Sequence, residues 1–250
     1  MADEQKFPSE IIDLPSKGKL YSKNHPLRSG KLELKYMTAR EEDILTSANL
    51  IKKGLMISTL LDSLILTEGV KSDDLVLGDK NAVMVAARIL AYGPEYQCQV
   101  TNPNDGSNFI HTFNLSDCGF REIPDNIDDN SFEFKLPICK KTINFKILTG
   151  KEEALIEQDL KGNKKTGALV SPELTTRLRY VITSVDGNDE RSIIAAFSEN
   201  ILARDSMALR QEIAKVSPDI ELKQEIDIEG ESVKVDIPMT VNFFWPESQT

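Results

Sequence analysis

Apolar and polar positions along this chain form two kinds of pattern: alternation at every second residue, and recurrence every three to four residues. Residues 32–45 begin with the alternating stretch Leu-Glu-Leu-Lys-Tyr, which predicts a strand. Thr38 then stands three residues before Glu41, the spacing of a capping box, which predicts that a helix begins there. We therefore expect a strand that leads directly into a helix.

The same combination returns later in the chain. Residues 143–156 align with residues 32–45 without a gap, at a constant offset of 143 − 32 = 111. The alignment also repeats the capping box, with Thr149 and Glu152 in the second copy. Two generic amphipathic segments could agree by coincidence, but an ungapped match that includes both caps favours an internal duplication.

The correspondence continues into two later helices. The sequence Asp-Lys-Asn-Ala at residues 79–82 recurs as Asp-Ser-Met-Ala at residues 205–208, an offset of 205 − 79 = 126. Either aspartate can cap a helix, and each predicted helix stops before a proline, Pro94 or Pro218. The larger offset places the extra residues of the second copy in the Gly- and Lys-rich stretch 161–167, which we expect to be an exposed loop.

Each of these helices is followed by an alternating segment that a glycine turn interrupts. The segments are residues 96–113, with an Asn-Asp-Gly turn at 104–106, and residues 221–244, with a Glu-Gly turn at 229–230. Alternation on both sides of such a turn predicts one β-hairpin in each half of the chain.

These elements predict an α+β fold of two tandem, duplicated modules, each with a strand, a capped helix, further helices and a terminal β-hairpin. We expect an N-terminal arm at 1–30, a first module at 31–122, a linker with a lead-in strand at 123–140, and a second module at 141–250.

The helix predicted over residues 80–92 has a face of small residues, Ala82, Ala86 and Ala87, and a single charge, Arg88. Such a face lets another element approach closely. It is expected either to be buried inside its own module or to form a groove for a partner's helix.

Composition narrows the classes of protein that fit this pattern. The 250 residues include 30 Lys and Arg against 40 Asp and Glu, a formal net charge of −10, and 40% are hydrophobic. These values indicate a soluble globular protein and argue against nucleic-acid binding, which needs a broad basic surface. Charges interrupt the apolar stretch 50–66, so we expect an amphipathic helix rather than stable membrane insertion. The first residues lack the pattern of a signal peptide, and we expect a cytosolic protein.

Candidate catalytic and metal-binding residues are few. Cys98, Cys118 and Cys139 form no disulfide framework, which is typical of a reducing compartment, and the histidines are His25, in a polar turn, and His111, in an alternating segment. A thiol–imidazole pair or a zinc site using Cys98, His111 and Cys118 is a minor alternative, because the spacing matches no paired-ligand pattern. The sequence contains no phosphate-binding loop and no nucleophile-elbow motif. We therefore predict binding rather than catalysis, with no catalytic, metal-binding or cofactor-binding residue.

The segment 14–21, Leu-Pro-Ser-Lys-Gly-Lys-Leu-Tyr, is compact and basic in an acidic protein. Its proline and glycine exclude a helix, and its apolar residues could pack as an arm or pair with a sheet edge. The alternative is a solvated turn that exposes two lysines.

The segment 243–246, Phe-Phe-Trp-Pro, holds the only tryptophan. Successive aromatics in a strand would point to both faces, so the segment either seals the C-terminal hairpin or forms a docking site. From the two segments, the candidate partner-binding residues are Leu14, Pro15, Ser16, Gly18, Leu20, Tyr21, Phe243, Phe244, Trp245 and Pro246.

Together these stretches resemble the baseplate hub assembly proteins, or baseplate hub assembly chaperones, of T-even-type tailed bacteriophages. The resemblance rests on residues 14–21, 34–45, 78–96 and 238–246, which follow in order along nearly the whole chain. It implies a viral assembly factor that acts in the host cytoplasm through protein contacts, without nucleotide hydrolysis. The implied partners are hub proteins, with tape-measure proteins as further candidates. The oligomeric state and the presence of the protein in the virion are left open.

The chain departs from that family at its hairpins, where Cys-Pro-x-Cys-Gly knuckles often resemble small zinc ribbons. Residues 101–106 and 227–231 keep proline or glycine but contain no cysteine. A structural zinc needs four thiolate or imidazole ligands, so the hairpins are expected to be degenerate and free of metal. Cys98 and Cys118 are then expected to be small packed residues.

The sequence thus supports three functional hypotheses. The first is a baseplate hub assembly factor or chaperone without an active site. The second is a permanent structural subunit of the hub or tail. The third, remote from the motifs present, is a thiol- or metal-dependent hydrolase.

Overall fold

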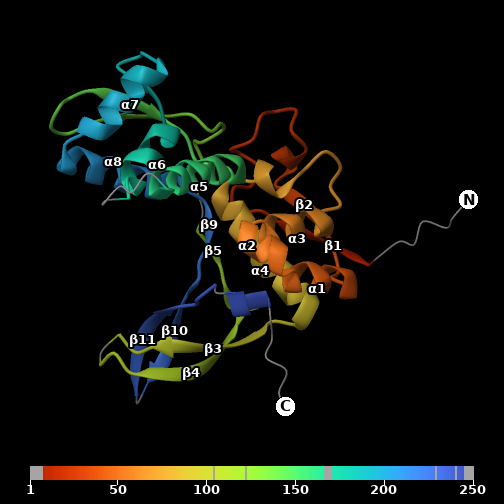
Figure 1. Cartoon of the computed structure of the whole chain (residues 1–250). Coiled ribbons are helices and arrows are strands. Elements are labelled where there is room, and N and C mark those ends of the chain that lie inside the picture. Colours follow the sequence, from red (N-terminus) through yellow and green to blue (C-terminus); the bar gives the residue numbers. More distant parts are fainter. Residues whose placement is uncertain are drawn as a thin grey trace, which may run out of the picture.

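Helices and small antiparallel sheets make up the structure, which confirms the predicted α+β class (Figure 1). The computed structural model describes residues 8–103, 105–121, 123–165, 171–228, 230–239 and 241–244. The first half contains β1 (Ser9–Asp13), η1 (Pro26–Ser29), β2 (Lys31–Lys35), α1 (Ala39–Thr46), α2 (Ala48–Lys53), α3 (Met56–Leu64), η2 (Ser72–Asp74), α4 (Leu77–Tyr92), β3 (Glu95–Thr101), β4 (Asn108–Asn114), η3 (Leu115–Asp117) and β5 (Phe120–Arg121). The second half contains β6 (Phe132–Lys135), β7 (Thr142–Phe145), α5 (Gly150–Lys165), α6 (Glu173–Val181), β8 (Ile182–Val185), α7 (Arg191–Asn200), α8 (Ala203–Val216), β9 (Asp219–Ile220), β10 (Lys223–Ile228), β11 (Glu231–Asp236) and η4 (Val241–Phe244).

The first half begins with the antiparallel pair β1–β2, in which Ser9 lies opposite Lys35. α1 follows at the capping box expected from the sequence. The Glu41 carboxylate accepts hydrogen bonds from the Thr38 backbone N–H at 2.9 Å and from the Lys35 ammonium at 2.8 Å. The local sequence therefore fixes the turn from strand to helix.

The second half repeats this turn. β6 and β7 pair antiparallel, β8 adds a third strand, and α5 follows. The Glu152 carboxylate accepts from the Thr149 N–H at 2.8 Å and from the Lys146 ammonium at 2.7 Å. Both predicted capping boxes are confirmed, while the duplication that they suggest stays a prediction.

Helix α5 extends further than expected. It continues to Lys165, which corrects the expectation of a loop over residues 161–167 as far as the described residues reach. Lysine is a good helix former, and Lys161 pairs with Glu157 one turn earlier at 3.0 Å.

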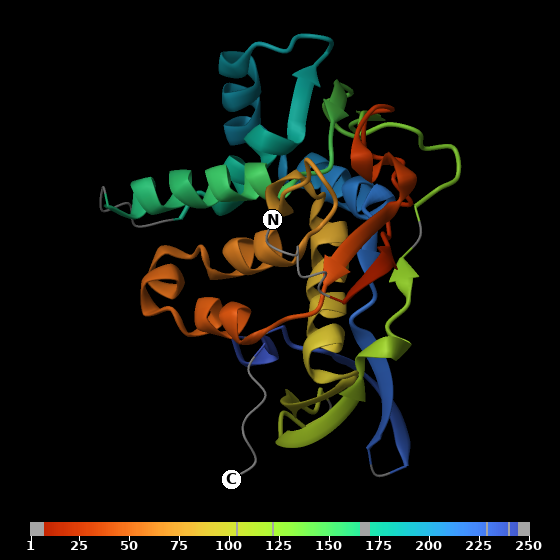
Figure 2. The same cartoon turned by 90° about the vertical axis from the view of Figure 1, so that its right-hand side faces the viewer.

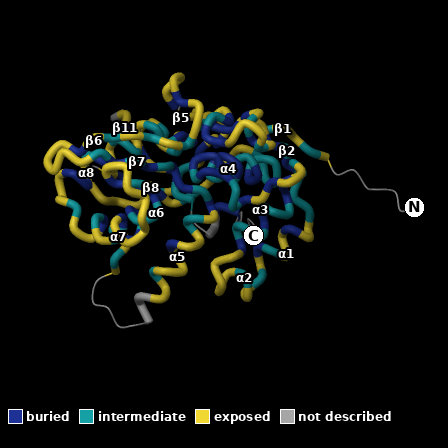
Figure 3. The backbone as a smooth tube through the Cα atoms, turned by 90° about the horizontal axis from the view of Figure 1, so that it is seen from above, coloured by how far each residue is buried: buried dark blue, intermediate teal, exposed yellow. Residues whose placement is uncertain are grey.

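The molecule has three levels in Figure 1: helices α5–α8 above, α1–α4 with β1–β2 in the middle, and the hairpins β3–β4 and β10–β11 below. The two-residue strands β5 and β9 pair where the chain passes between these levels. Figure 2 shows α4 running through the middle of the molecule toward the hairpins. In Figure 3 this helix lies in the interior. α4 therefore connects all three levels.

The two predicted hairpins are confirmed, and they share one core although they come from different halves of the chain. The Tyr96 hydroxyl donates to the Pro238 carbonyl at 3.0 Å, and the Gln224 amide donates to the Asn114 carbonyl at 2.9 Å. The same core also includes the buried residues of α3 and α4. The predicted boundaries 31–122 and 141–250 stay predictions, but the hairpin of the second range packs with the first.

The two halves meet at the start of α4. Val76 and Thr149 form an antiparallel bridge, flanked by a hydrogen bond of 2.9 Å from the Gly150 N–H to the Leu75 carbonyl. Gly78 also lies against the chain that leaves α8, at Pro218. A β carbon at Gly78 would lie 1.8 Å from the Pro218 carbonyl oxygen, and one at Gly150 would lie 2.9 Å from the Asp73 α carbon. Both glycines are therefore required for this close approach.

We predict that Gly78→Ala lowers the free energy of unfolding by about 1–3 kcal/mol, because the added methyl group forces the halves apart. Urea denaturation followed by circular dichroism measures the change. Gly162→Ala is the control, since the space around this helical glycine is open. It should raise stability by up to about 1 kcal/mol. Equal stability of Gly78→Ala and the natural chain would contradict the prediction.

We also predict that the two capping boxes weaken in acid. Burial alone would raise the pKa of Glu41 and Glu152, but hydrogen bonds from lysine and threonine outweigh it and hold each pKa below its ordinary value of 4.5. A depressed pKa stabilises the fold at higher pH, and the stabilisation is lost as pH falls from about 4.5 through the folded-state pKa.

The double variant Glu41→Gln/Glu152→Gln should therefore be less stable than the natural chain at pH 7 and should lose less stability between pH 7 and pH 3. Urea unfolding at each pH tests this. Glu133→Gln, at an exposed position of β6, is the control and should follow the natural pH profile. Parallel profiles for the natural chain and the double variant would contradict the expectation.

Candidate functional site

The buried carboxylate of Asp79, the third residue of α4, is the centre around which the N-terminal segment folds. It accepts hydrogen bonds from the Ser16 backbone N–H at 2.9 Å, the Ser16 hydroxyl at 2.6 Å and the Tyr21 hydroxyl at 2.7 Å. The Tyr21 oxygen in turn accepts from the Val76 N–H at 3.0 Å. The segment is thus fastened to the first turn of α4.

The six candidate residues of this segment lie inside the protein. Leu14, Pro15, Ser16, Gly18, Leu20 and Tyr21 are all buried, and only the two lysines reach the surface. A β carbon at Gly18 would lie 2.4 Å from the Arg28 carbonyl oxygen, and its φ of +76° is a left-handed conformation that glycine adopts readily. In this structure the segment packs against the fold and its apolar side chains are buried, while partner binding by these residues stays a prediction.

Burial is the largest influence on the pKa values of Asp79 and Tyr21. Burial raises the pKa of Asp79, and the hydrogen bonds from Ser16 and Tyr21 act in the opposite direction by stabilising the charged form. Burial, followed by the Asp79 charge, raises the pKa of Tyr21 well above its ordinary value. The tyrosine hydroxyl therefore stays protonated and donates a hydrogen bond to the carboxylate.

A related arrangement occurs at Asp205, the third residue of α8. Its carboxylate accepts from the Ile138 N–H at 2.8 Å and from the Cys139 N–H at 3.0 Å. The sequence signal for this contact is the Leu-Pro pair at 136–137, which repeats the pair at 14–15 with an offset of 136 − 14 = 122. Sequence analysis matched the two aspartates but did not identify the backbone segments that they bind.

The C-terminal aromatics seal the hairpin core. Phe243 and Phe244 are both buried, and the Phe243 ring packs edge to face on Tyr96 with centroids 5.1 Å apart. They lie in η4 rather than in the expected strand, because β11 ends at Asp236 and the chain then passes through a proline that has no N–H to donate. Trp245 and Pro246 lie outside the described residues.

Arg88 explains why η4 docks at the end of α4. Its guanidinium donates to the backbone carbonyls of Phe243 at 2.9 Å, Gly93 at 3.0 Å and Glu95 at 3.2 Å. The small residues beside it, Ala82 and Ala87, are buried in the same core. The burial interpretation of this helix face is therefore confirmed at these two positions.

The β3–β4 hairpin holds a thiol and an imidazole at facing positions. Cys98 lies opposite His111 in the β3–β4 hairpin, but burial raises the pKa of this thiol to about 11. The His111 ring packs between aromatic rings of β4, with its centroid 4.7 Å from that of Phe113. Within the described residues, no group of three or more His, Cys, Asp or Glu side chains is placed to hold a metal ion. The described residues also contain no helix that is long and apolar enough to cross a membrane.

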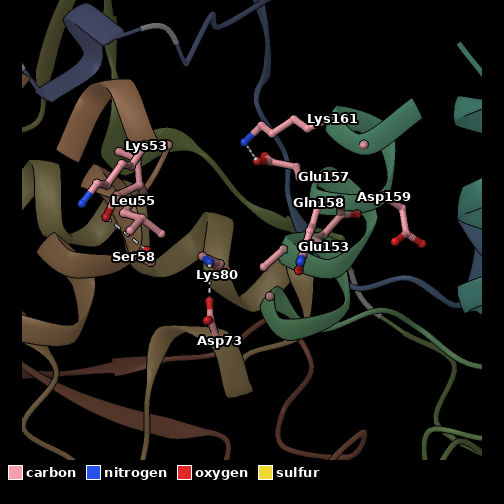
Figure 4. A pocket seen from close by; sticks show the side chains of 15 residues that line it. Lys53, Leu55, Ser58, Asp73, Lys80, Glu153, Glu157, Gln158, Asp159 and Lys161 are labelled. Carbon is pink, nitrogen blue, oxygen red and sulfur yellow. Dashed lines mark hydrogen bonds and ion pairs between the residues drawn. The ribbon is translucent and has the colours of Figure 1, made fainter. Parts of the chain in front are cut away.

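A cleft of about 980 Å³ lies between the α2–α3 corner and α5 (Figure 4). Lys80 and Asp73 form an ion pair of 3.4 Å at the base of the view. The α2–α3 wall carries Lys53 and Leu55, and the leucine is 48% exposed. The α5 wall is acidic and contributes Glu153, Glu157 and Asp159.

Sequence analysis missed this cleft because its walls are about 100 residues apart in the chain. Only the packing of the two halves brings them together. The sequence feature that could have indicated a binding surface here is the amphipathic stretch 50–66. Its apolar residues Ile51 and Leu55 remain exposed in the structure.

A family model described as T4 bacteriophage base plate protein matches residues 8–245. The chain belongs to this family. No curated protein matches it, and no solved structure matches it. The family match supports the resemblance stated above to the extent that this chain is a T4-type baseplate protein.

We predict that Tyr21→Phe lowers the free energy of unfolding by about 1–3 kcal/mol, because it removes one of the three hydrogen bonds to a buried carboxylate and leaves the Val76 N–H without its acceptor. Urea unfolding at pH 7 measures the loss. The control is Tyr36→Phe, whose hydroxyl bonds to Glu10 at an exposed site. It should change stability by no more than about 0.5 kcal/mol. Similar losses in both variants would refute the central role of Asp79.

Proposed function

We propose that this baseplate protein is an assembly factor, or chaperone, of the baseplate hub. It binds hub proteins in the host cytoplasm and brings them together at the start of baseplate formation. Tape-measure proteins are the second class of candidate partner. The protein acts through protein contacts and not through catalysis.

The cleft between the α2–α3 corner and α5 is the observation that carries this proposal. Leu55 and Ile57 line the cleft beside charged residues, and Leu55 is 48% exposed. Apolar side chains surrounded by a polar rim are typical of protein-binding surfaces. Helices that are far apart in the chain form the two walls of the cleft, and we infer that the space between them receives a segment of another protein.

The charges in the cleft favour binding over reaction chemistry. Lys80 pairs with Asp73 and Lys161 with Glu157, so these groups stabilise each other.

The thiols outside the cleft also favour binding over reaction chemistry. Burial raises the pKa of Cys98 to about 11 and raises that of Cys118, so both thiols stay protonated at neutral pH. A protonated thiol is a poor nucleophile.

Co-expression with single hub or tape-measure proteins, followed by size-exclusion chromatography with light scattering, tests the proposal. We expect a defined complex with at least one hub protein. Leu55→Asp should reduce complex formation at least tenfold, because a carboxylate replaces an apolar contact at the cleft. The matched control is Leu202→Asp. Leu202 is 50% exposed and precedes α8, where aspartate is a favourable cap.

Failure to form a complex with any hub or tape-measure protein would contradict the proposed function. Loss of binding in Leu202→Asp as well as Leu55→Asp would contradict the location of the binding surface. Both variants should keep the helical circular dichroism of the natural chain.

Mass spectrometry of purified virions separates an assembly factor from a permanent subunit. We expect the protein to be absent from mature particles, or present far below the amount of the hub proteins. An amount equal to that of a hub protein would instead establish a structural subunit.

A further inference from the structure

A smaller pocket of about 250 Å³ lies where α4, α6 and α8 meet, and it shares no lining residue with the cleft. Its lining is largely apolar and comes from both halves of the chain. The apolar lining residues are Leu77, Ile147, Leu148, Leu174, Leu178, Val181, Ile213 and Pro218. Leu148 and Leu178 are almost completely buried, whereas Leu174 is 44% exposed, so the pocket leads from the surface into the core.

Cations line the pocket beside this apolar surface. Lys146, Arg177 and Arg210 contribute to its lining, against one acidic residue, Asp219. Asp219 already accepts hydrogen bonds from Asn81 and Arg121. Cationic side chains therefore outnumber acidic ones in the lining of this pocket, in a chain whose net charge is −10.

The three cations differ in what they already bind. Lys146 pairs with Glu152 of the capping box, and Arg177 makes a two-pronged pair with Glu153. Arg210 is exposed on α8 and makes no ion pair or side-chain hydrogen bond to the part of the chain that the structure describes. Its guanidinium is available to an anion that approaches the pocket.

We infer that this pocket binds a segment of a partner protein in which a bulky apolar side chain stands next to an aspartate or glutamate. The inference rests on the proposed function, since it specifies the chemistry of the baseplate partner. The apolar side chain enters between α6 and α8, and the neighbouring carboxylate pairs with Arg210.

The size and polarity of the pocket favour such an occupant. Water in an apolar pocket lacks hydrogen-bond partners, and cavities of about 150 Å³ lined by aliphatic residues take up benzene-sized molecules. A volume of about 250 Å³ is therefore sufficient for one aromatic side chain. A buried apolar anchor surrounded by a charged rim is also the usual form of a binding hot spot.

Fluorescence polarisation with the full-length protein tests the inference. The probe is a fluorescein-labelled peptide, Ser-Gly-Asp-Phe-Glu-Gly-Ser. One control peptide replaces Phe with Ala, and a second replaces both acidic residues with Lys. We expect the probe to bind at least tenfold more tightly than either control peptide.

Two protein variants locate the binding. Arg210→Glu should weaken binding of the probe at least tenfold, and Leu174→Asp should do the same by placing a carboxylate at the mouth of the pocket. The matched control is Arg204→Glu, an exposed arginine on the same helix that does not line the pocket. It should bind the probe as the natural chain does.

Equal binding of the three peptides, no binding of the probe, or equal effects of Arg204→Glu and Arg210→Glu would each overturn the inference. Concentration-dependent self-association that Arg210→Glu abolishes would do so as well, because the occupant would then be a second copy of this chain. If a hub complex forms and both pocket variants retain its full affinity, the inference fails while the proposed function stands. If no hub complex forms, the proposed function fails, and the peptide assay still reports on the pocket.

Discussion

The Asp79 carboxylate lies fully buried in the first turn of α4, where it accepts hydrogen bonds from Ser16 and Tyr21. A carboxylate is costly to remove from water unless donors surround it, and the positive end of the helix dipole contributes here as well. At the far end of the same helix, Arg88 binds three carbonyls, including that of Phe243. One central helix thus holds an N-terminal segment by its first turn and a C-terminal segment by its last. The rest of the fold is arranged around it.

The features that local sequence determines could be predicted. Both capping boxes, both hairpins and the α+β class follow from spacings of a few residues, and the structure confirms them. The residues 14–21 and 243–244 stand out in the sequence as candidates for partner binding, but their buried surroundings could not be predicted. The sequence around Ser16 is typical of an exposed turn, and its hydrogen-bond partner Asp79 is 63 positions away in the chain. The strand expected at Phe243 was wrong: β11 ends at Asp236, and after Pro238 the chain forms η4, whose Phe243 carbonyl accepts a hydrogen bond from the distant Arg88.

The candidate binding surfaces depend on still longer separations. The cleft has walls from α2–α3 and α5, and the small pocket combines α4 with α6 and α8. The hydrophobic periodicity of a single helix or strand predicts neither the cleft nor the pocket. The sequence does contain one related signal, which is the presence of leucines such as Leu55 at positions that the amphipathic pattern places outside the core. Under the proposed function, charges that already pair with each other in the cleft would add little to affinity, and the exposed apolar groups would be the main source of binding energy.

The close contact between the halves limits how this chain can vary. A β carbon at Gly78 would meet the backbone at Pro218, and one at Gly150 would meet the backbone at Asp73. Backbone atoms cannot turn aside as the end of a flexible side chain can, so any larger residue has to move one half relative to the other. Two glycines that carry no chemistry of their own therefore constrain the fold as strictly as its buried apolar residues do.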